Sequence, residues 1–277
     1  MTAWRERVAV VDHPVAHSLS PAIHNAAFAD AGLDWEMVAE DVAPEDGPGV
    51  VASARARGLR GLAVTMPHKV VVAETVDSLD PAASALRSVN TVVFSDAGSE
   101  GLSTDGDGFV DSLRAAGHDP VGAAIVLIGA GAAARSIVDS LGRSGAGRIL
   151  VANRTAAAAR EAANLAPVGE VVADGGVDAA IAMADIVVNT TPVGMGADAR
   201  SCPIDPRSLT PSHVVVDIVY HPLETALLRA ASERGAATVD GLGMLVHQAC
   251  RQQIAWTGIA PDPVALRMAA LAELAHR

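Results

Sequence analysis

The chain has few of the residues that mark secreted, membrane-spanning or metal-binding proteins. Its 277 residues include only two cysteines, Cys202 and Cys250, which form neither a disulfide framework nor a metal-ligand set, and we expect both to be small buried or half-buried residues. Three histidines, His13, His17 and His24, match no metal-site spacing, so we expect polar packing residues. No apolar run approaches the ~20 residues of a membrane span, and no signal peptide is apparent. These absences predict a cytoplasmic protein that neither spans a membrane nor binds a metal ion.

Positive charge is also scarce. The chain carries 32 acidic residues against 20 lysines and arginines, which gives a formal net charge of −12. This charge argues against nucleic acid or an anionic membrane as a partner, because both are densely negative. An anionic small molecule must therefore be held by local groups.

Lysine is the scarcest cation, since Lys69 is the only one in the chain. Arginine stays protonated under ordinary conditions, whereas an ammonium group on a flexible stem is a compact proton donor whose pKa responds to burial. One interpretation is therefore a catalytic lysine, and the other is an accident of codon usage. Composition alone favours the second.

A loop with two serines follows the first strand-like segment, Val8–Val11. Ser20 and Pro21 make a good N-cap and N1 pair for a helix that ends near Gly32. Ser18 and Ser20 would then lie at the positive end of a helix, where hydroxyl and N–H donors suit a carboxylate or phosphate oxygen. A cap at Ser20 with Ser18 facing water fits these residues equally well.

Lys69 follows a short apolar segment, residues 59–64. Pro67 ends this strand and a helix starts, so we expect Lys69 in the first turn of a helix that leaves the carboxyl end of a strand. Open α/β sheets place their sites at that end. Asp105, exposed on a glycine-rich turn, could pair with Lys69 and keep it charged. Taken by itself, Asp105 is better read as an ordinary turn aspartate.

The second half opens with a dinucleotide-binding pattern in the required strand, turn and helix context. Residues 123–128 predict a buried parallel strand, and the next strand, 148–152, is not followed by the acid that would bind the ribose of NAD. Arg154 can instead pair with a 2′-phosphate, which predicts NADP. The turn after the first strand matches the fingerprint with alanine at the third glycine position, and reads Gly129, Ala130, Gly131, Ala132 and Ala133.

Alternating strands and helices continue to the C-terminus and predict a parallel sheet with right-handed crossovers. Thr191 and Pro192 lie just past a strand end, where a loop would face the nicotinamide. Tyr220 also lies past a strand end, where a half-buried aromatic is an alternative. A long helix from Gly241 could bring Gln248 to the site, although an exposed helical glutamine is the simpler interpretation.

Eight short motifs occur in the order seen in shikimate dehydrogenases, and the resemblance covers essentially the whole chain. The motifs are Ser18-x-Ser20-Pro21, Val64-Thr65-x-Pro67-x-Lys69, Val89-Asn90-Thr91, Thr104-Asp105-x-x-Gly108, Gly129-Ala130-Gly131-x-Ala133-Ala134-Arg135, Asn153-Arg154-Thr155, Thr191-Pro192-x-Gly194-Met195 and Asp240-Gly241-x-x-Met244-Leu245-x-x-Gln248. The resemblance implies an α/β fold of two domains separated by a cleft. A substrate domain, residues 1–105 completed by C-terminal helices 242–277, would face a Rossmann-type doubly wound NADP-binding domain, residues 106–241.

The resemblance also implies an activity, the reversible reduction of 3-dehydroshikimate to shikimate by NADPH in aromatic amino-acid biosynthesis, by a monomer or homodimer. Lys69 and Asp105 would be catalytic. The residues that would bind substrate are Ser18, Ser20, Thr65, Asn90, Tyr220 and Gln248. Those that would bind the cofactor are Gly129, Ala130, Gly131, Ala132, Ala133, Asn153, Arg154, Thr155, Thr191, Pro192, Val219, Gly241 and Met244.

Three positions depart from the family pattern and keep alternatives open. Ala63 and Ser103 stand where asparagine is usual, so a related cyclitol acid, quinate or aminoshikimate, is a possible substrate; the pair Ser18 and Ser20 favours shikimate over quinate. Ala158 stands where many relatives carry a second arginine for NADP. A non-catalytic NADP-binding sensor would not need Lys69 and Asp105. A folate-linked methylene dehydrogenase would have a tyrosine before its lysine, and none is present.

Overall fold

The computed structural model describes residues 5–276 and contains two compact units, each with its own six-stranded sheet. Unit 1 comprises Met1–Thr104 and Val246–Arg277, and unit 2 comprises Asp105–Leu245. The chain thus leaves unit 1 after Thr104 and returns to it within one helix. No helix in the described part of the chain is long and apolar enough to cross a membrane.

The sheet of unit 1 has the strand order β2-β1-β3-β5-β6-β4. Strands β2, β1 and β3 are parallel, whereas β5 is antiparallel to both β3 and β6. Val8–Val11 is fully buried along its length, as expected for a strand covered on both faces. The strands are β1 (Glu6–Asp12), β2 (Trp35–Asp41), β3 (Gly61–Val64), β4 (Ser78–Leu79), β5 (Thr91–Ser95) and β6 (Gly98–Leu102).

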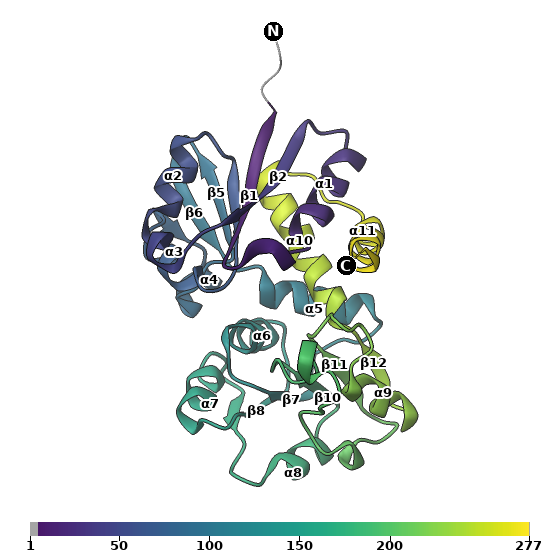
Figure 1. Cartoon of the computed structure of the whole chain (residues 1–277). Helices are drawn as coiled ribbons and strands as arrows, with labels where there is room; N and C mark the ends of the chain where they lie inside the picture. Colours follow the sequence, from purple (N-terminus) through teal and green to yellow (C-terminus); the bar gives the residue numbers. More distant parts are fainter. Residues whose placement is uncertain (1–4, 277) are drawn as a thin grey trace. The chain divides into compact units, whose positions relative to one another are not determined.

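Helices cover both faces of this sheet (Figure 1). One face packs against α2, α3 and α4, and the other against α1 and the unit 1 part of α10, with α11 packed on α1. The helices are α1 (Ser20–Asp30), α2 (Val50–Ala56), α3 (Lys69–Ala73), α4 (Pro81–Leu86), α10 (Gly241–Thr257) and α11 (Pro263–Ala275), with short 3-10 helices η1 (Val15–His17) and η2 (Pro44–Gly49).

The sheet of unit 2 is parallel throughout, with the order β12-β11-β10-β7-β8-β9. This confirms the predicted Rossmann-type sheet, and the strand order reverses between β7 and β10, where such sheets bind ligands. The strands are β7 (Ala124–Ile128), β8 (Arg148–Ala152), β9 (Gly169–Val171), β10 (Ile186–Asn189), β11 (Val214–Asp217) and β12 (Ala237–Val239).

Two apolar clusters hold the helices of unit 2 against its sheet. One lies beneath α5, α6 and α7, and the other beneath α8 and α9. These helices are α5 (Asp105–Ala115), α6 (Ala132–Arg143), α7 (Ala156–Ala163), α8 (Val177–Ala182) and α9 (Ala226–Glu233), with 3-10 helices η3 (Gly196–Asp198) and η4 (Pro206–Ser208). Burial of each large aliphatic side chain stabilises such a core by about 1.5–3 kcal/mol.

Candidate active site

The turn before Lys69 is fixed by main-chain hydrogen bonds. The Thr65 amide donates to the Val11 carbonyl at 3.0 Å, and the His68 amide donates to the Thr65 carbonyl at 2.9 Å. Helix α3 then begins at Lys69, which is half-buried. The predicted position of Lys69, in the first turn of a helix beyond the carboxyl end of a strand, is therefore confirmed.

The two serines lie at the start of α1, but the predicted cap is wrong. Leu19 occupies the N-cap position without a side-chain hydrogen bond, and the helix begins at Ser20 itself. The Ser20 amide donates to the Ser18 hydroxyl at 3.3 Å, so a local serine turn replaces the cap. Ser18 and Ser20 are both half-buried.

Two of the three N-terminal histidines are exposed, so the expectation of three polar packing residues holds for the buried His24 alone. His13 Nδ1 lies 2.7 Å from Asp41 Oδ1, and His17 Nε2 lies 3.6 Å from Asp12 Oδ2. Asp12 and Asp41 are register partners at the ends of β1 and β2, so the carboxylates draw both rings to this edge. Burial raises the pKa of Asp12, against a hydrogen bond from the His13 amide that lowers it.

A buried polar network surrounds Asn90, which is 3% exposed. Its Nδ2 donates to Thr104 Oγ1 at 2.9 Å and reaches Gln248 Oε1 at 3.5 Å. Its Oδ1 accepts from the Thr104 amide at 2.8 Å and from the Thr91 hydroxyl at 3.0 Å. The structure therefore brings Asn90 and Gln248 together, and Gln248 is buried, not exposed. Thr104 and Thr91 were quoted in motifs, yet their role as partners of Asn90 was missed.

Ala63, the position that departs from the family pattern, faces an apolar environment. It is 4% exposed and belongs to a cluster with Val8, Phe28 and Trp256. An asparagine at this position would place a carboxamide among apolar side chains.

Asp105 is the first residue of α5 and is half-buried, so its predicted place on an exposed glycine-rich turn is wrong. The glycine that follows serves helix packing. A Cβ on Gly106 would lie 2.0 Å from the Ser136 carbonyl oxygen of α6, so only glycine allows α5 and α6 to approach this closely. Close packing was mistaken for a turn signal because both favour glycine.

The turn after β7 lies close to the loop that follows β10. Gly129 has φ of +115°, and a Cβ there would lie 2.5 Å from Thr190 Oγ1. Gly131 is the N-cap of α6 without a side-chain hydrogen bond, and both Gly131 and Ala132 are exposed, whereas Ala130 and Ala133 are half-buried. The first turn of a helix offers N–H groups and a positive dipole end to a phosphate.

The residues after β8 present one cation. Arg154 is exposed, and its guanidinium makes no hydrogen bond or ion pair with any residue that the structure describes. Asn153 Nδ2 donates to the Thr155 carbonyl at 3.1 Å, and Thr155 caps α7 without a side-chain bond. Arg154 is therefore available to an anionic ligand.

A buried pair that sequence reasoning missed, Asn189 and Asp217, anchors the loops beyond β10 and β11. Asn189 Nδ2 donates to Asp217 Oδ1 at 2.9 Å, and the Thr191 hydroxyl donates to Asn189 Oδ1 at 2.7 Å. Burial raises the pKa of Asp217, although hydrogen bonds from Thr225, Val219 and Asn189 oppose it. The available signal was a polar residue at the carboxyl end of each of two buried strands.

The remaining predicted cofactor residues lie near the ends of the same strands. Val219 is buried, whereas Pro192 is exposed. A Cβ on Gly241 would lie 2.3 Å from the Ile218 carbonyl oxygen, so α10 starts in direct contact with the chain beyond β11. Met244 packs on the adjacent core.

The catalytic and substrate-binding predictions divide between the units. Lys69 lies in unit 1 and Asp105 in unit 2, and Tyr220, half-buried beyond β11, also lies in unit 2. The other predicted substrate residues belong to unit 1. Among residues 5–276, no three His, Cys, Asp or Glu side chains are grouped to hold a metal ion.

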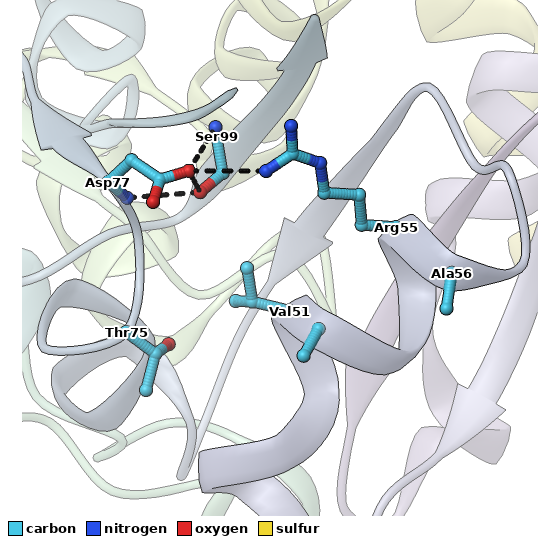
Figure 2. Close-up of a pocket in the computed structure, with 7 residues that line it drawn as sticks. Val51, Arg55, Ala56, Thr75, Asp77 and Ser99 are labelled. Atoms are coloured by element: carbon cyan, nitrogen blue, oxygen red, sulfur yellow. Dashed lines mark hydrogen bonds and ion pairs between the residues drawn. The ribbon is translucent and has the colours of Figure 1, made fainter. Parts of the chain in front are cut away.

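A separate surface pocket of unit 1, about 370 Å³ in volume, is lined by none of the predicted catalytic, substrate-binding or cofactor-binding residues (Figure 2). Three of its polar side chains interact with one another. Asp77 accepts from the Ser99 amide at 2.7 Å and its hydroxyl at 2.8 Å, and lies 3.4 Å from Arg55. The lining residues are Val51, Ala52, Arg55, Ala56, Thr75, Asp77 and Ser99.

Both halves of the chain match known families. Residues 10–92 match the family described as shikimate dehydrogenase substrate binding domain, and residues 114–199 match that described as shikimate / quinate 5-dehydrogenase.

Individual proteins match over nearly the whole chain. A shikimate dehydrogenase (NADP(+)) of Moorella thermoacetica is 42% identical and covers 91% of this chain and 88% of its own. The crystal structure of shikimate 5-dehydrogenase from Thermus thermophilus in complex with NADP(H) and shikimate is 34% identical, with a TM-score of 0.89 over 96% of this chain and 99% of that one. Quinate dehydrogenase from Corynebacterium glutamicum in complex with NAD is 30% identical, with a TM-score of 0.90 over 96% and 99%. This chain belongs to the shikimate dehydrogenase family.

Proposed function

We propose that the protein is an NADP-dependent shikimate dehydrogenase that interconverts 3-dehydroshikimate and shikimate in aromatic amino-acid biosynthesis. The observation that carries this proposal is the position of Lys69, the only lysine, at the first turn of α3 in a chain that also has a dinucleotide turn after β7. The 42% identity to a protein named shikimate dehydrogenase (NADP(+)) supports the same reaction.

Unit 1 supplies the substrate residues in this proposal. Ser18 and Ser20 bind the substrate carboxylate, with Tyr220 of unit 2 as a further hydroxyl donor. Thr65, Asn90 and Gln248 hydrogen-bond the ring hydroxyls. Because Asn90 and Gln248 are buried and lie within one polar network, their carboxamides have few orientations available to them.

Lys69 is the proton donor for the ketone. Lys69 would give its ammonium proton to the carbonyl oxygen of 3-dehydroshikimate while bound NADPH would supply a hydride to the carbonyl carbon, and the products would be shikimate and NADP+. The cation stabilises the alkoxide charge that develops, and Asp105 is the second catalytic residue of the proposal. Water then restores the proton to Lys69.

Unit 2 supplies the cofactor residues. The pyrophosphate of NADP would lie at the start of α6 against Gly129, Ala130, Gly131, Ala132 and Ala133, and Arg154 would pair with the 2′-phosphate beside Asn153 and Thr155. Thr191, Pro192, Val219, Gly241 and Met244 would surround the nicotinamide half. When bound, NADPH supplies the hydride.

Purified protein tests the proposal directly. We expect shikimate and NADP+ to give 3-dehydroshikimate and NADPH in equal amounts, followed by absorbance of the reduced nicotinamide and by chromatography of the acid. Binding of NADP+ without turnover of any cyclitol acid would favour a sensor.

Quinate is the second candidate substrate, because the quinate dehydrogenase of Corynebacterium glutamicum has the same fold at a TM-score of 0.90. Turnover of quinate in preference to shikimate would support it, and aminoshikimate belongs in the same assay because of Ala63. We propose a monomer or homodimer, which sedimentation would distinguish.

A further inference from the structure

A fully buried histidine, His24, lies on α1 four residues after Ser20 and has no part in the reaction described above. Its ring packs 5.1 Å from the Trp256 ring and 6.2 Å from the Phe28 ring, measured between centroids. Burial lowers the pKa of His24 to about 4 and outweighs the opposing effect of its hydrogen bonds with two glutamines. The ring is therefore neutral near pH 7 and carries one N–H.

The two ring nitrogens both face glutamine oxygens. Nδ1 lies 3.3 Å from Gln253 Oε1, and Nε2 lies 3.1 Å from Gln252 Oε1. A neutral imidazole can donate to only one of them, so the other nitrogen would turn its lone pair toward an oxygen lone pair. Gln253 Nε2, meanwhile, is buried without a hydrogen-bond partner in the described structure.

One rotation of the Gln253 carboxamide resolves both conflicts. The oxygen and nitrogen of a side-chain amide have nearly the same shape, so their assignment follows from the hydrogen-bond network. With Nε2 of Gln253 toward the ring, Gln253 donates to His24 Nδ1, and His24 donates from Nε2 to Gln252. The proton of His24 is thereby placed on Nε2.

The other half of Gln252 continues the chain of hydrogen bonds to Asn90. Its Nε2 donates to the Asn90 carbonyl at 3.1 Å and to the Thr91 hydroxyl at 3.1 Å. That hydroxyl donates onward to Asn90 Oδ1 at 3.0 Å. Because a carbonyl can only accept, the orientation of Gln252 is fixed at this end.

We propose that His24 is a positioning residue for Asn90. It acts through a series of hydrogen bonds in which His24 donates to Gln252, Gln252 donates to Thr91, and Thr91 donates to Asn90. The inference rests on the proposed function, in which Asn90 binds a ring hydroxyl of the substrate. These hydrogen bonds connect α1, which begins at Ser20, to the segment that carries Asn90. One buried imidazole thereby helps to fix the positions of two proposed substrate-binding residues relative to each other.

Two matched variants separate positioning from simple core packing. His24→Gln can place an amide N–H near the position of Nε2, which keeps the donor to Gln252, whereas His24→Asn reaches only the position of Nδ1. We expect His24→Asn to raise the KM for shikimate about tenfold, the effect of one lost hydrogen bond that leaves a buried partner unpaired. His24→Gln should stay within about threefold of the unaltered protein, and the KM for NADP+ and kcat should not change in either variant.

A second variant covers the case in which His24→Asn fails to fold. Gln252→Met keeps the length of the side chain and removes both donors to the Asn90 segment, so the same rise in the KM for shikimate is expected. An unchanged KM for shikimate in either folded variant, or equal losses in His24→Gln and His24→Asn, would overturn the positioning role. Absence of shikimate turnover in the unaltered protein would instead refute the proposed function.

The tautomer is tested without any activity. Nitrogen-15 NMR of the histidine rings in the unaltered protein should show a protonated Nε2 and an unprotonated Nδ1 for His24, with no change between about pH 6 and pH 8, where an ordinary histidine titrates. A proton on Nδ1, or on both nitrogens, would overturn the assigned direction of the chain.

Discussion

Asn90 and Gln248, proposed to bind the substrate, differ in burial and in hydrogen bonding from Gly131 and Arg154, proposed to bind the cofactor. Asn90 and Gln248 in unit 1 are buried and share hydrogen bonds with each other and with Thr104. In unit 2, Gly131 and Arg154 are exposed; one offers a main-chain N–H, and the guanidinium of the other has no partner among the described residues.

This difference predicts different responses to mutation. Removal of one member of a buried network leaves its partners unpaired, at about 1–3 kcal/mol for each buried group. Removal of an exposed cation loses only its interaction with the ligand, which solvent screens. We therefore expect substitutions of the buried Asn90 and Gln248 to have strong, non-additive effects, and substitution of the exposed Arg154 to have a weak one.

The largest effect is expected at Lys69, the proton donor of the proposed reaction. Lys69→Ala should lower kcat about 10³-fold with little change in the KM for shikimate, because general acid catalysis contributes about 10²–10⁴. Lys69→Arg should recover little, since guanidinium keeps its proton. Arg55→Ala, which removes a cation from the separate pocket of Figure 2, is the control and should leave kcat unchanged. Near-native turnover of Lys69→Ala would exclude this role.

The buried network should also make unit 1 sensitive to acid. The pKa of His24 is about 4 when folded, against 6.5 ordinarily, so below pH 6.5 the unfolded chain takes up a proton that the folded chain does not. The free energy of unfolding should therefore fall by about 3 kcal/mol between pH 6.5 and pH 4, at about 1.4 kcal/mol per pKa unit.

Denaturant titration of His24→Gln beside the unaltered protein isolates this contribution, because carboxylates titrate in both. The difference in stability between the two should shrink by about 3 kcal/mol from pH 7 to pH 4. A difference that stays constant over this range would show that His24 does not take part in the acid response.

Asn90→Ala tests the substrate network itself. It should lower kcat/KM for shikimate about 30-fold, near 2 kcal/mol, because Thr104 and Gln248 lose a shared partner. The effect of Gln248→Ala should be smaller in this background than alone. Asn25→Ala is a matched control: Asn25 bonds the Met37 main chain at 2.7 and 3.0 Å, so it should cost stability and leave the KM for shikimate unchanged. Strictly additive effects of Asn90→Ala and Gln248→Ala would show that the two residues do not act through a shared network.

The smallest effect is expected at Arg154. Arg154→Ala should lower kcat/KM for NADP+ about tenfold and leave NAD+ unchanged, as loss of one exposed charge-assisted contact would. Arg160→Ala, another exposed arginine of the same segment, should change neither. Equal losses with NADP+ and NAD+ would assign Arg154 a role other than the 2′-phosphate.

Local sequence patterns predicted the parts of the fold that depend on local sequence. Apolar segments that end at glycine or proline were enough to predict the Rossmann sheet, the turn at Gly129 and the position of Lys69. Asp105 was misplaced because Gly106 serves a helix contact with Ser136, which lies far along the chain.

The buried hydrogen bonds of the site could not be read in this way. Gln252 meets Asn90 across 162 positions, and Asn189 meets Asp217 across 28, so their partners are defined only by the folded structure. Glutamines on a helix look like surface residues until the opposite strand is known. Burial in the folded structure, and not the composition of the chain, decides which polar residues form the hydrogen-bond networks of the candidate site.

The most direct test of the account compares kcat/KM for shikimate and quinate, each with NADP+ and NAD+. Shikimate with NADP+ should give the highest value, and exchange of shikimate for quinate should cost more than exchange of NADP+ for NAD+. The reason is that quinate has an added hydroxyl on the carbon that bears the carboxylate, which must fit beside Ser18 and Ser20, whereas NAD+ forgoes only the contact with one exposed arginine. A larger loss with NAD+ than with quinate, or faster turnover of quinate, would contradict the account.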